Sequence, residues 1–337
     1  MIRHAHLCVV CIAFLLSAAA FGATPGQDPS SMFDFHSGFW MNLHHFIYAA
    51  ASSSQPPTNK GPTLRINQPD AEAIKRLSPS EQAAWQHFVA YYAANYIQRD
   101  LGFDDLMYDI KIKLESAEAS PDLNGTDIPV ELKSILLEAA PIYRKYWWPR
   151  HDGRNKRWVA QLRPLLSKNG LRVRQSLEIV YSTAWPTQPV RVETVAYANW
   201  AGAYTTLCPA TQPTISTTHI GNQGTAALEM IFHESSHGMV DKLQDAIKQA
   251  VSTLPSDKQK VIPGTLWHAV LFYTAGELVA QHYRGYKPYA DQAALWARAW
   301  PEPVRSLIVR DWKPHIQGST TLNSAVTALV RDLASSH

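Results

Sequence analysis

Two histidines and a glutamate in the segment His233-Glu234-Ser235-Ser236-His237 carry the strongest chemical signal in this sequence. His233 and His237 are four residues apart, so on an α-helix they lie about 40° apart around the axis and one turn apart along it. Both imidazoles can then reach one metal ion. Zinc favours nitrogen ligands, and catalytic zinc sites use three protein ligands and leave one position for water.

Glu234 lies beside the first histidine, on the flank of the same helix face. A metal ion brings the pKa of its bound water close to neutral, and a carboxylate in this position can accept the proton that the water releases. The nucleophile formed in this way attacks a carbonyl carbon, which is the chemistry of amide hydrolysis without a covalent intermediate. We therefore expect Glu234 to be a general base.

The sequence around this segment agrees with a metal site. Segments rich in Val, Thr, Tyr and Ile at residues 188–200, 202–207 and 213–222 predict two or three antiparallel strands, and an edge strand can hold an extended peptide. A long helix is predicted directly after them, from about residue 225 to 252. Its apolar positions recur at helical spacing, at Leu228, Ile231, Phe232, Met239, Val240 and Leu243.

A second apolar helix, expected from about residue 265 to 283, carries one acid, Glu277. A carboxylate in such a helix is costly unless it is paired or bound to a metal, and the segment contains no Lys or Arg. One carboxylate would also offset part of the charge that two neutral histidines leave on a zinc ion. We therefore predict Glu277 as the third zinc ligand, with an ion pair to a basic residue of the N-terminal half as the alternative.

This combination resembles the gluzincin group of zinc metallopeptidases, over about residues 190–285. The resemblance rests on HESSH in a helix after a small sheet and on a Glu in a following helix, although His237 and Glu277 are further apart than in the best-known gluzincins. It implies a zincin-like catalytic domain, a bound Zn²⁺ and a peptide or protein substrate. The metzincin pattern requires Gly and His where this sequence has Val240 and Leu243, so that group is excluded.

Two other residues compete with Glu277 for the third position. Asp241 lies one turn further along the first helix, where it is better suited to accept a hydrogen bond from a ligand imidazole. His268 precedes Glu277 by nine residues, so the two side chains face opposite sides of their helix. Tyr273, one turn before Glu277, is the candidate for stabilising the oxyanion, with packing in the core as its alternative role.

The other histidines and the cysteine of the mature chain are expected to have ordinary roles. His219, at the end of the last strand, is a candidate to face substrate, but a surface or capping histidine is the commoner case. His36, His44 and His45 lie among aromatic residues, which favours packing and hydrogen bonding over a second metal site. Cys208 is expected to be a small buried apolar residue, since no cysteine motif surrounds it.

The first residues of the chain have the pattern of an export signal. Arg3 lies in the first six residues, and residues 7–20 form an apolar run that ends in small side chains. This run is shorter than the roughly 20 residues of a spanning helix, so we expect a secreted or periplasmic protein with no stable membrane anchor after signal removal. A mature chain that begins between Phe21 and Pro25 would have one cysteine and therefore no internal disulfide.

We predict an α+β protein that is mainly α-helical, with a signal peptide at 1–23, a helical N-terminal region at 24–185 and a zincin-like catalytic domain with a small antiparallel sheet and an active-site helix at 186–337. Ser78-Pro79-Ser80-Glu81 supplies an N-cap, a first-turn proline and a capping-box glutamate for a helix that runs to about residue 100. Further helices are expected at about 34–51, 104–117, 130–147, 155–167, 172–185, 290–299, 304–313 and 322–335.

The sequence therefore favours a secreted zinc metallopeptidase that hydrolyses peptide bonds. Lys and Arg are scattered and nearly balanced by Asp and Glu, 31 against 28, so nothing supports nucleic-acid binding. One alternative is a structural or binding protein in which a fourth ligand completes a metal site that only joins two helices. Another is a silent protein of the same fold that holds a peptide or glycan and would not be affected by loss of Glu234.

Overall fold

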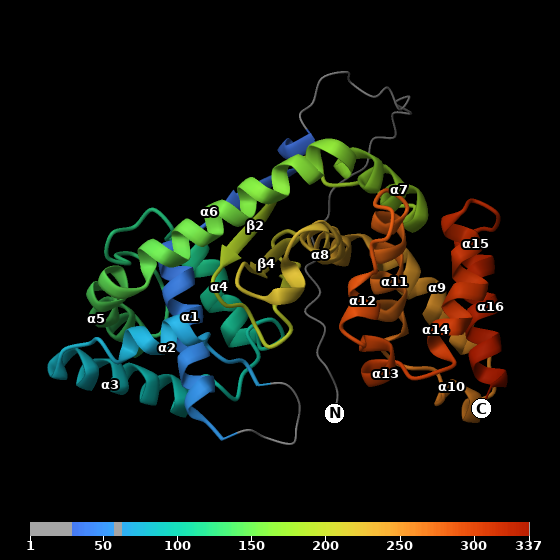
Figure 1. The fold of residues 1–337 in the computed structure, drawn as a ribbon. Helices are drawn as coiled ribbons and strands as arrows, with labels where there is room; N and C mark the ends of the chain where they lie inside the picture. Colours follow the sequence, from blue (N-terminus) through green and yellow to red (C-terminus); the bar gives the residue numbers. More distant parts are fainter. Residues whose placement is uncertain (1–28, 57–62, 337) are drawn as a thin grey trace.

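A computed structural model describes residues 29–56 and 63–336 of the chain, so the expected signal peptide lies outside the described residues (Figure 1). The helices of the first half are α1 (Phe39–Ser54), α2 (Gln68–Ile74), α3 (Pro79–Asn95), α4 (Asp105–Ser116), α5 (Val130–Tyr146), α6 (Trp148–Leu165) and α7 (Leu171–Tyr181). Those of the second half are α8 (Thr225–Ser236), α9 (Asp241–Ser252), α10 (Ser256–Gln259), α11 (Leu266–Ala280), α12 (Tyr289–Gln292), α13 (Leu295–Ala299), α14 (Val304–Leu307), α15 (Lys313–Ile316) and α16 (Leu322–Ser335). Within these ranges, no helix is long and apolar enough to cross a membrane.

Two helices of the N-terminal half, α3 and α4, begin where their capping residues predict. The Ser78 side chain accepts a hydrogen bond from the Glu81 N–H, and the Glu81 carboxylate accepts one from the Ser78 N–H, so the capping box of α3 is complete. Asp104 caps α4 by accepting from the N–H groups of the second and third helical residues. These caps satisfy N–H groups that a helix leaves without partners at its start, which explains why these two starts were predicted well. In contrast, α6 has no side-chain cap, and it begins at Trp148 instead of at about residue 155.

The sheet differs from the antiparallel arrangement that we expected. Its strands are β1 (Phe33–His36), β2 (Val190–Val195), β3 (Ala203–Thr206) and β4 (Gln212–Ser216), in the spatial order β1-β2-β4-β3. Only β3 and β4 pair antiparallel, whereas β1 with β2 and β2 with β4 pair parallel. The prediction was wrong because β4 inserts between β2 and β3, and because an unforeseen strand near the start of the chain adds the fourth member. The fold is nevertheless mainly helical with a small sheet, as expected.

Two hydrophobic cores lie on either side of this sheet. The first joins α1, α3, α4 and α5 with residues 195–198 and Tyr204. The second contains α8, α9, α11 and α16, and it also contains Phe33, the later part of α6, and α7. Figure 1 shows α6 running across the molecule from α5 to α7, so this one helix extends along both halves of the fold. The cores therefore do not divide at residue 185, where we had placed a domain boundary.

The predicted long helix from 225 to 252 is interrupted at His237, the last residue of the histidine motif. Residues 237–239 form a 3-10 turn, and α9 continues from Asp241. A Cβ atom added at Gly238 would lie 1.9 Å from the Thr211 Oγ1 atom, so a larger residue here would require the Thr211 side chain, between β3 and β4, to move. The interruption lets α9 leave in a new direction, where it packs against α16.

Candidate metal centre

Three imidazoles meet between α8 and α11. Possible ligand nitrogens of His233, His237 and His268 all lie within 4.8 Å of one another. The Nε2 atoms of His233 and His268 are 3.3 Å apart. Two nitrogens bound to one tetrahedral zinc at about 2.0–2.1 Å are roughly 3.3–3.4 Å apart, so this spacing fits a shared zinc ion. Among the described residues, this is the one group of three or more His, Cys, Asp or Glu side chains with ligand atoms this close together.

The protonation state of the three rings also suits metal binding. Burial lowers the pKa of His237 to about 3 and that of His268 to about 4, and it lowers the pKa of His233 well below its usual value. The rings are therefore neutral near pH 7 and keep a lone pair for a metal. The Nδ1 atom of His233 is buried without a hydrogen-bond partner in the described structure, so Nε2 carries the polar interactions of this ring.

Aromatic side chains hold the imidazoles in place. The ring of Phe272 stacks on His233 with a centroid distance of 3.8 Å and an interplanar angle of 27°. Trp267 stacks on His268 at 5.0 Å, and Trp300 meets the same imidazole edge-on at 5.8 Å. Because these contacts are apolar, they restrict the rings without competing for the nitrogen lone pairs.

Glu234 lies at the edge of this cluster. Its Oε2 atom is 3.8 Å from His237 Nε2, and the Thr205 hydroxyl, on β3, lies 2.7 Å from the same oxygen and donates to it. Burial raises the pKa of Glu234 to about 7, although the Thr205 hydrogen bond and the positive charge of Lys111 act in the opposite direction. A carboxylate with a pKa near neutral is suited to accept and return a proton.

The structure corrects our prediction for the third metal ligand. Glu277 lies outside the cluster, where its Oε1 atom forms an ion pair with Lys313 Nζ at 2.8 Å. Tyr273 donates to the other carboxylate oxygen at 3.3 Å, so its hydroxyl points to Glu277 and not to the imidazoles. His268 faces α8 in its place, which agrees with the expected opposite orientation of His268 and Glu277 on their helix. The prediction failed because it weighed the cost of an unpaired carboxylate but not a cation from α15.

The other residues considered from the sequence lie outside the cluster. Asp241 is exposed at the start of α9. His219 caps a 3-10 turn (Ile220–Asn222) by accepting from the Gly221 N–H. Cys208 is exposed, which corrects the expectation that it would be buried.

The three N-terminal histidines all make hydrogen bonds to protein groups. His36 lies between two carboxylates, those of Asp34 and Glu118. His44 bonds the Tyr92 hydroxyl at 2.7 Å, and His45 bonds the Tyr204 hydroxyl at 2.8 Å. This agrees with the packing and hydrogen-bonding roles expected for them.

One functional feature was missed from the sequence. Glu229, one turn before His233, accepts hydrogen bonds from the Tyr286 hydroxyl at 2.6 Å and from the Tyr289 N–H at 2.9 Å. It therefore ties the segment after α11 to α8. The ring of Tyr289 in turn stacks on Phe272, the residue that covers His233. An acid among the apolar residues of the first helix was the only signal for this contact.

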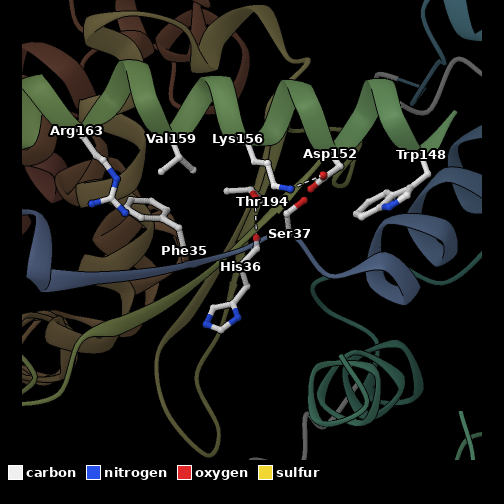
Figure 2. Close-up of a pocket in the computed structure, with 9 residues that line it drawn as sticks. All are labelled: Phe35, His36, Ser37, Trp148, Asp152, Lys156, Val159, Arg163 and Thr194. Atoms are coloured by element: carbon white, nitrogen blue, oxygen red, sulfur yellow. Dashed lines mark hydrogen bonds and ion pairs between the residues drawn. The ribbon is translucent and has the colours of Figure 1, made fainter. Parts of the chain in front are cut away.

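A separate hollow of about 470 Å³ lies between α6 and β1 (Figure 2). Its polar walls are already paired: Lys156 and Asp152 form an ion pair at 2.6 Å, and the Thr194 hydroxyl donates to the His36 carbonyl at 2.6 Å. None of the candidate metal ligands lines it. The lining residues are Phe35, His36, Ser37, Trp148, Asp152, Lys156, Val159, Arg163 and Thr194.

Comparison with protein-family models, with curated proteins and with solved structures gave no match to this chain. The gluzincin resemblance therefore stays a prediction, and the function has to be argued from the site itself.

Proposed function

We propose that this protein is a zinc-dependent hydrolase of peptide bonds, with His233, His237 and His268 as the metal ligands. The observation that carries the proposal is the convergence of three neutral imidazoles on one point with Glu234 beside them. Three nitrogen ligands with one position left for water are the arrangement of catalytic zinc, whereas structural sites use four protein ligands. The histidine at the third position departs from the gluzincin pattern.

Glu234 supplies the proton transfers in this proposal. When bound, zinc would polarise the substrate carbonyl and lower the pKa of water at the site. Glu234 then accepts a proton from water as the water oxygen bonds to the carbonyl carbon. When the carbon–nitrogen bond breaks, Glu234 returns the proton to the departing amine. The sum is one water consumed and one peptide bond replaced by a carboxylate and an amine.

The edge of the sheet supports a peptide as substrate. β3 is the last strand in the sheet, and its central residue Thr205 is opposite Pro213, which has no N–H. The Ser216 N–H bonds the Gly202 carbonyl, so hydrogen-bonded pairs alternate along the hairpin and Thr205 is in a pair without hydrogen bonds. The backbone N–H and C=O of Thr205 therefore point away from β4, where an extended chain can pair with them beside Glu234.

The test is to measure zinc and cleavage on the same preparation. Purified protein should contain about one zinc per chain and should cleave members of a peptide library. Glu234→Gln should retain zinc and fold but lose about a hundredfold or more in rate, since amide nitrogen cannot act as the base. A wild-type protein that binds zinc but cleaves no peptide would contradict the proposal and favour a metal site that only joins α8 and α11.

A further inference from the structure

Strand β3 connects the helical N-terminal region to the metal centre. Successive side chains of a strand point to opposite faces of the sheet. Tyr204 and Thr206 point to one face, toward α1 and α4, and Thr205 points to the other, toward α8. The strand thus has anchors on one side and a contact to Glu234 on the other.

The anchors on the N-terminal side are buried and specific. The Tyr204 hydroxyl bonds His45 Nε2 on α1 at 2.8 Å. Lys111, a fully buried lysine on α4, donates to Thr206 Oγ1 at 2.6 Å and to the Gln212 carbonyl at 3.0 Å. Because Gln212 belongs to β4, Lys111 bridges the two strands of the hairpin. These contacts restrict both the register and the position of β3.

On the opposite side, Thr205 is the one hydrogen-bond donor to the Glu234 carboxylate in the described structure. Its hydroxyl lies 2.7 Å from Oε2 and 2.9 Å from the backbone oxygen of Glu234, near the end of α8. Oε1 has no hydrogen-bond donor within the described ranges. The contact therefore orients the carboxylate while it leaves one oxygen available to a water molecule.

We propose that Thr205 is a positioning residue for Glu234, and that the N-terminal helices hold the base in place through β3. The proposal rests on the hydrolase function, since it assigns Thr205 a part in the same reaction. The two oxygens of a carboxylate are chemically equivalent, and rotation of the side chain exchanges their positions. A single donor at 2.7 Å on one of them is enough to select one orientation. Loss of this hydrogen-bond donor leaves the metal ligands in place. The Glu234 carboxylate can then rotate away from the water molecule whose proton it accepts.

The kinetic test compares three single variants with wild type on one peptide substrate. Thr205→Val keeps the shape but removes the donor, and we expect kcat to fall about tenfold to hundredfold with KM and zinc content nearly unchanged. Thr205→Ser restores the hydroxyl and should restore most of kcat. Thr194→Val is the matched control, because it removes a buried threonine hydroxyl that bonds the His36 carbonyl at the other end of the sheet. It should leave kcat unchanged.

A second measurement does not depend on catalysis. The unfolding equilibrium of the full chain is measured for wild type, Thr205→Val, Glu234→Ala and the double variant. A hydrogen bond to a charged group should appear as a coupling of about tenfold or more in the unfolding constant. No coupling, or an unchanged kcat in a folded Thr205→Val protein, would overturn the positioning role. Coupling in a protein that cleaves no peptide would instead leave the contact intact and contradict the hydrolase function.

Discussion

Replacing His268 with alanine should remove most of the stabilisation of this protein by zinc, whereas replacing Glu277 with glutamine should leave that stabilisation unchanged. The first variant removes one of three converging imidazoles. The second removes a charge that the structure pairs with Lys313, away from the cluster. This is the reverse of what the sequence led us to expect for the two residues.

The size of the effect follows from binding linkage. A ligand that binds only the folded state stabilises it by about 4 kcal/mol when its free concentration is about a thousand times its dissociation constant. His268→Ala should lose most of this increment at the same zinc concentration. The Glu277 ion pair is partly open to solvent, with side-chain exposures of 34% for Lys313 and 19% for Glu277. Its loss should therefore cost under about 1 kcal/mol, with or without zinc.

The assay is urea unfolding of each variant with buffered zinc and again with a chelator. His268 also packs against Trp267 and Phe272, so its replacement lowers the stability of the metal-free protein as well. The difference between the two conditions cancels this packing loss and isolates the metal. If Glu277→Gln removed the zinc increment and His268→Ala retained it, the three-histidine site would be refuted and the original sequence prediction restored.

Three further predictions concern the rest of the fold. Burial raises the pKa of the Glu229 carboxyl to about 7, above its unfolded value, so the folded state binds the proton more tightly. The free energy of unfolding should therefore fall by about 3 kcal/mol as pH rises from about 4.5 through 7. In Glu229→Gln, the free energy of unfolding plotted against pH should lack this part of the slope, and identical slopes in the two proteins would contradict the assignment. Burial alone would raise the pKa of the Asp70 carboxyl, but the hydrogen bonds of His151 and its neighbours outweigh burial, so the pKa lies below its usual value. The charged carboxylate therefore stabilises the fold above about pH 4, and this stabilisation is lost below that pH. Asp70→Asn should therefore cost about 2–3 kcal/mol at pH 7 in urea unfolding, and a cost that did not shrink in acid would count against a charged Asp70. Ser78→Ala removes the N-cap of α3 and should cost about 1 kcal/mol, with Ser78→Thr as the control that keeps the capping oxygen.

Local features of this protein were readable from the sequence because they depend on neighbours along the chain. The capping box at Ser78 and the four-residue spacing of His233 and His237 act within one or two helical turns, and the structure shows both as expected. The three strands before α8 were found because their composition and separating turns differ from the helices around them. The same holds for the opposite orientation of His268 and Glu277, which follows from helix geometry alone.

Tertiary packing decided what the sequence left open, above all which side of α11 faces α8. Spacing separated His268 from Glu277, but only the docking of α11 against α8, with Lys313 on the far side to neutralise the acid, selected the histidine. The strand order had the same origin, since β1 pairs with residues more than 150 positions away and β4 inserts between β2 and β3. This strand order makes β3 the edge strand beside Glu234, and Thr205 on β3 therefore contacts the Glu234 carboxylate. Contacts of this kind depend on the free energy of packing whole elements together, which no local pattern of residues records.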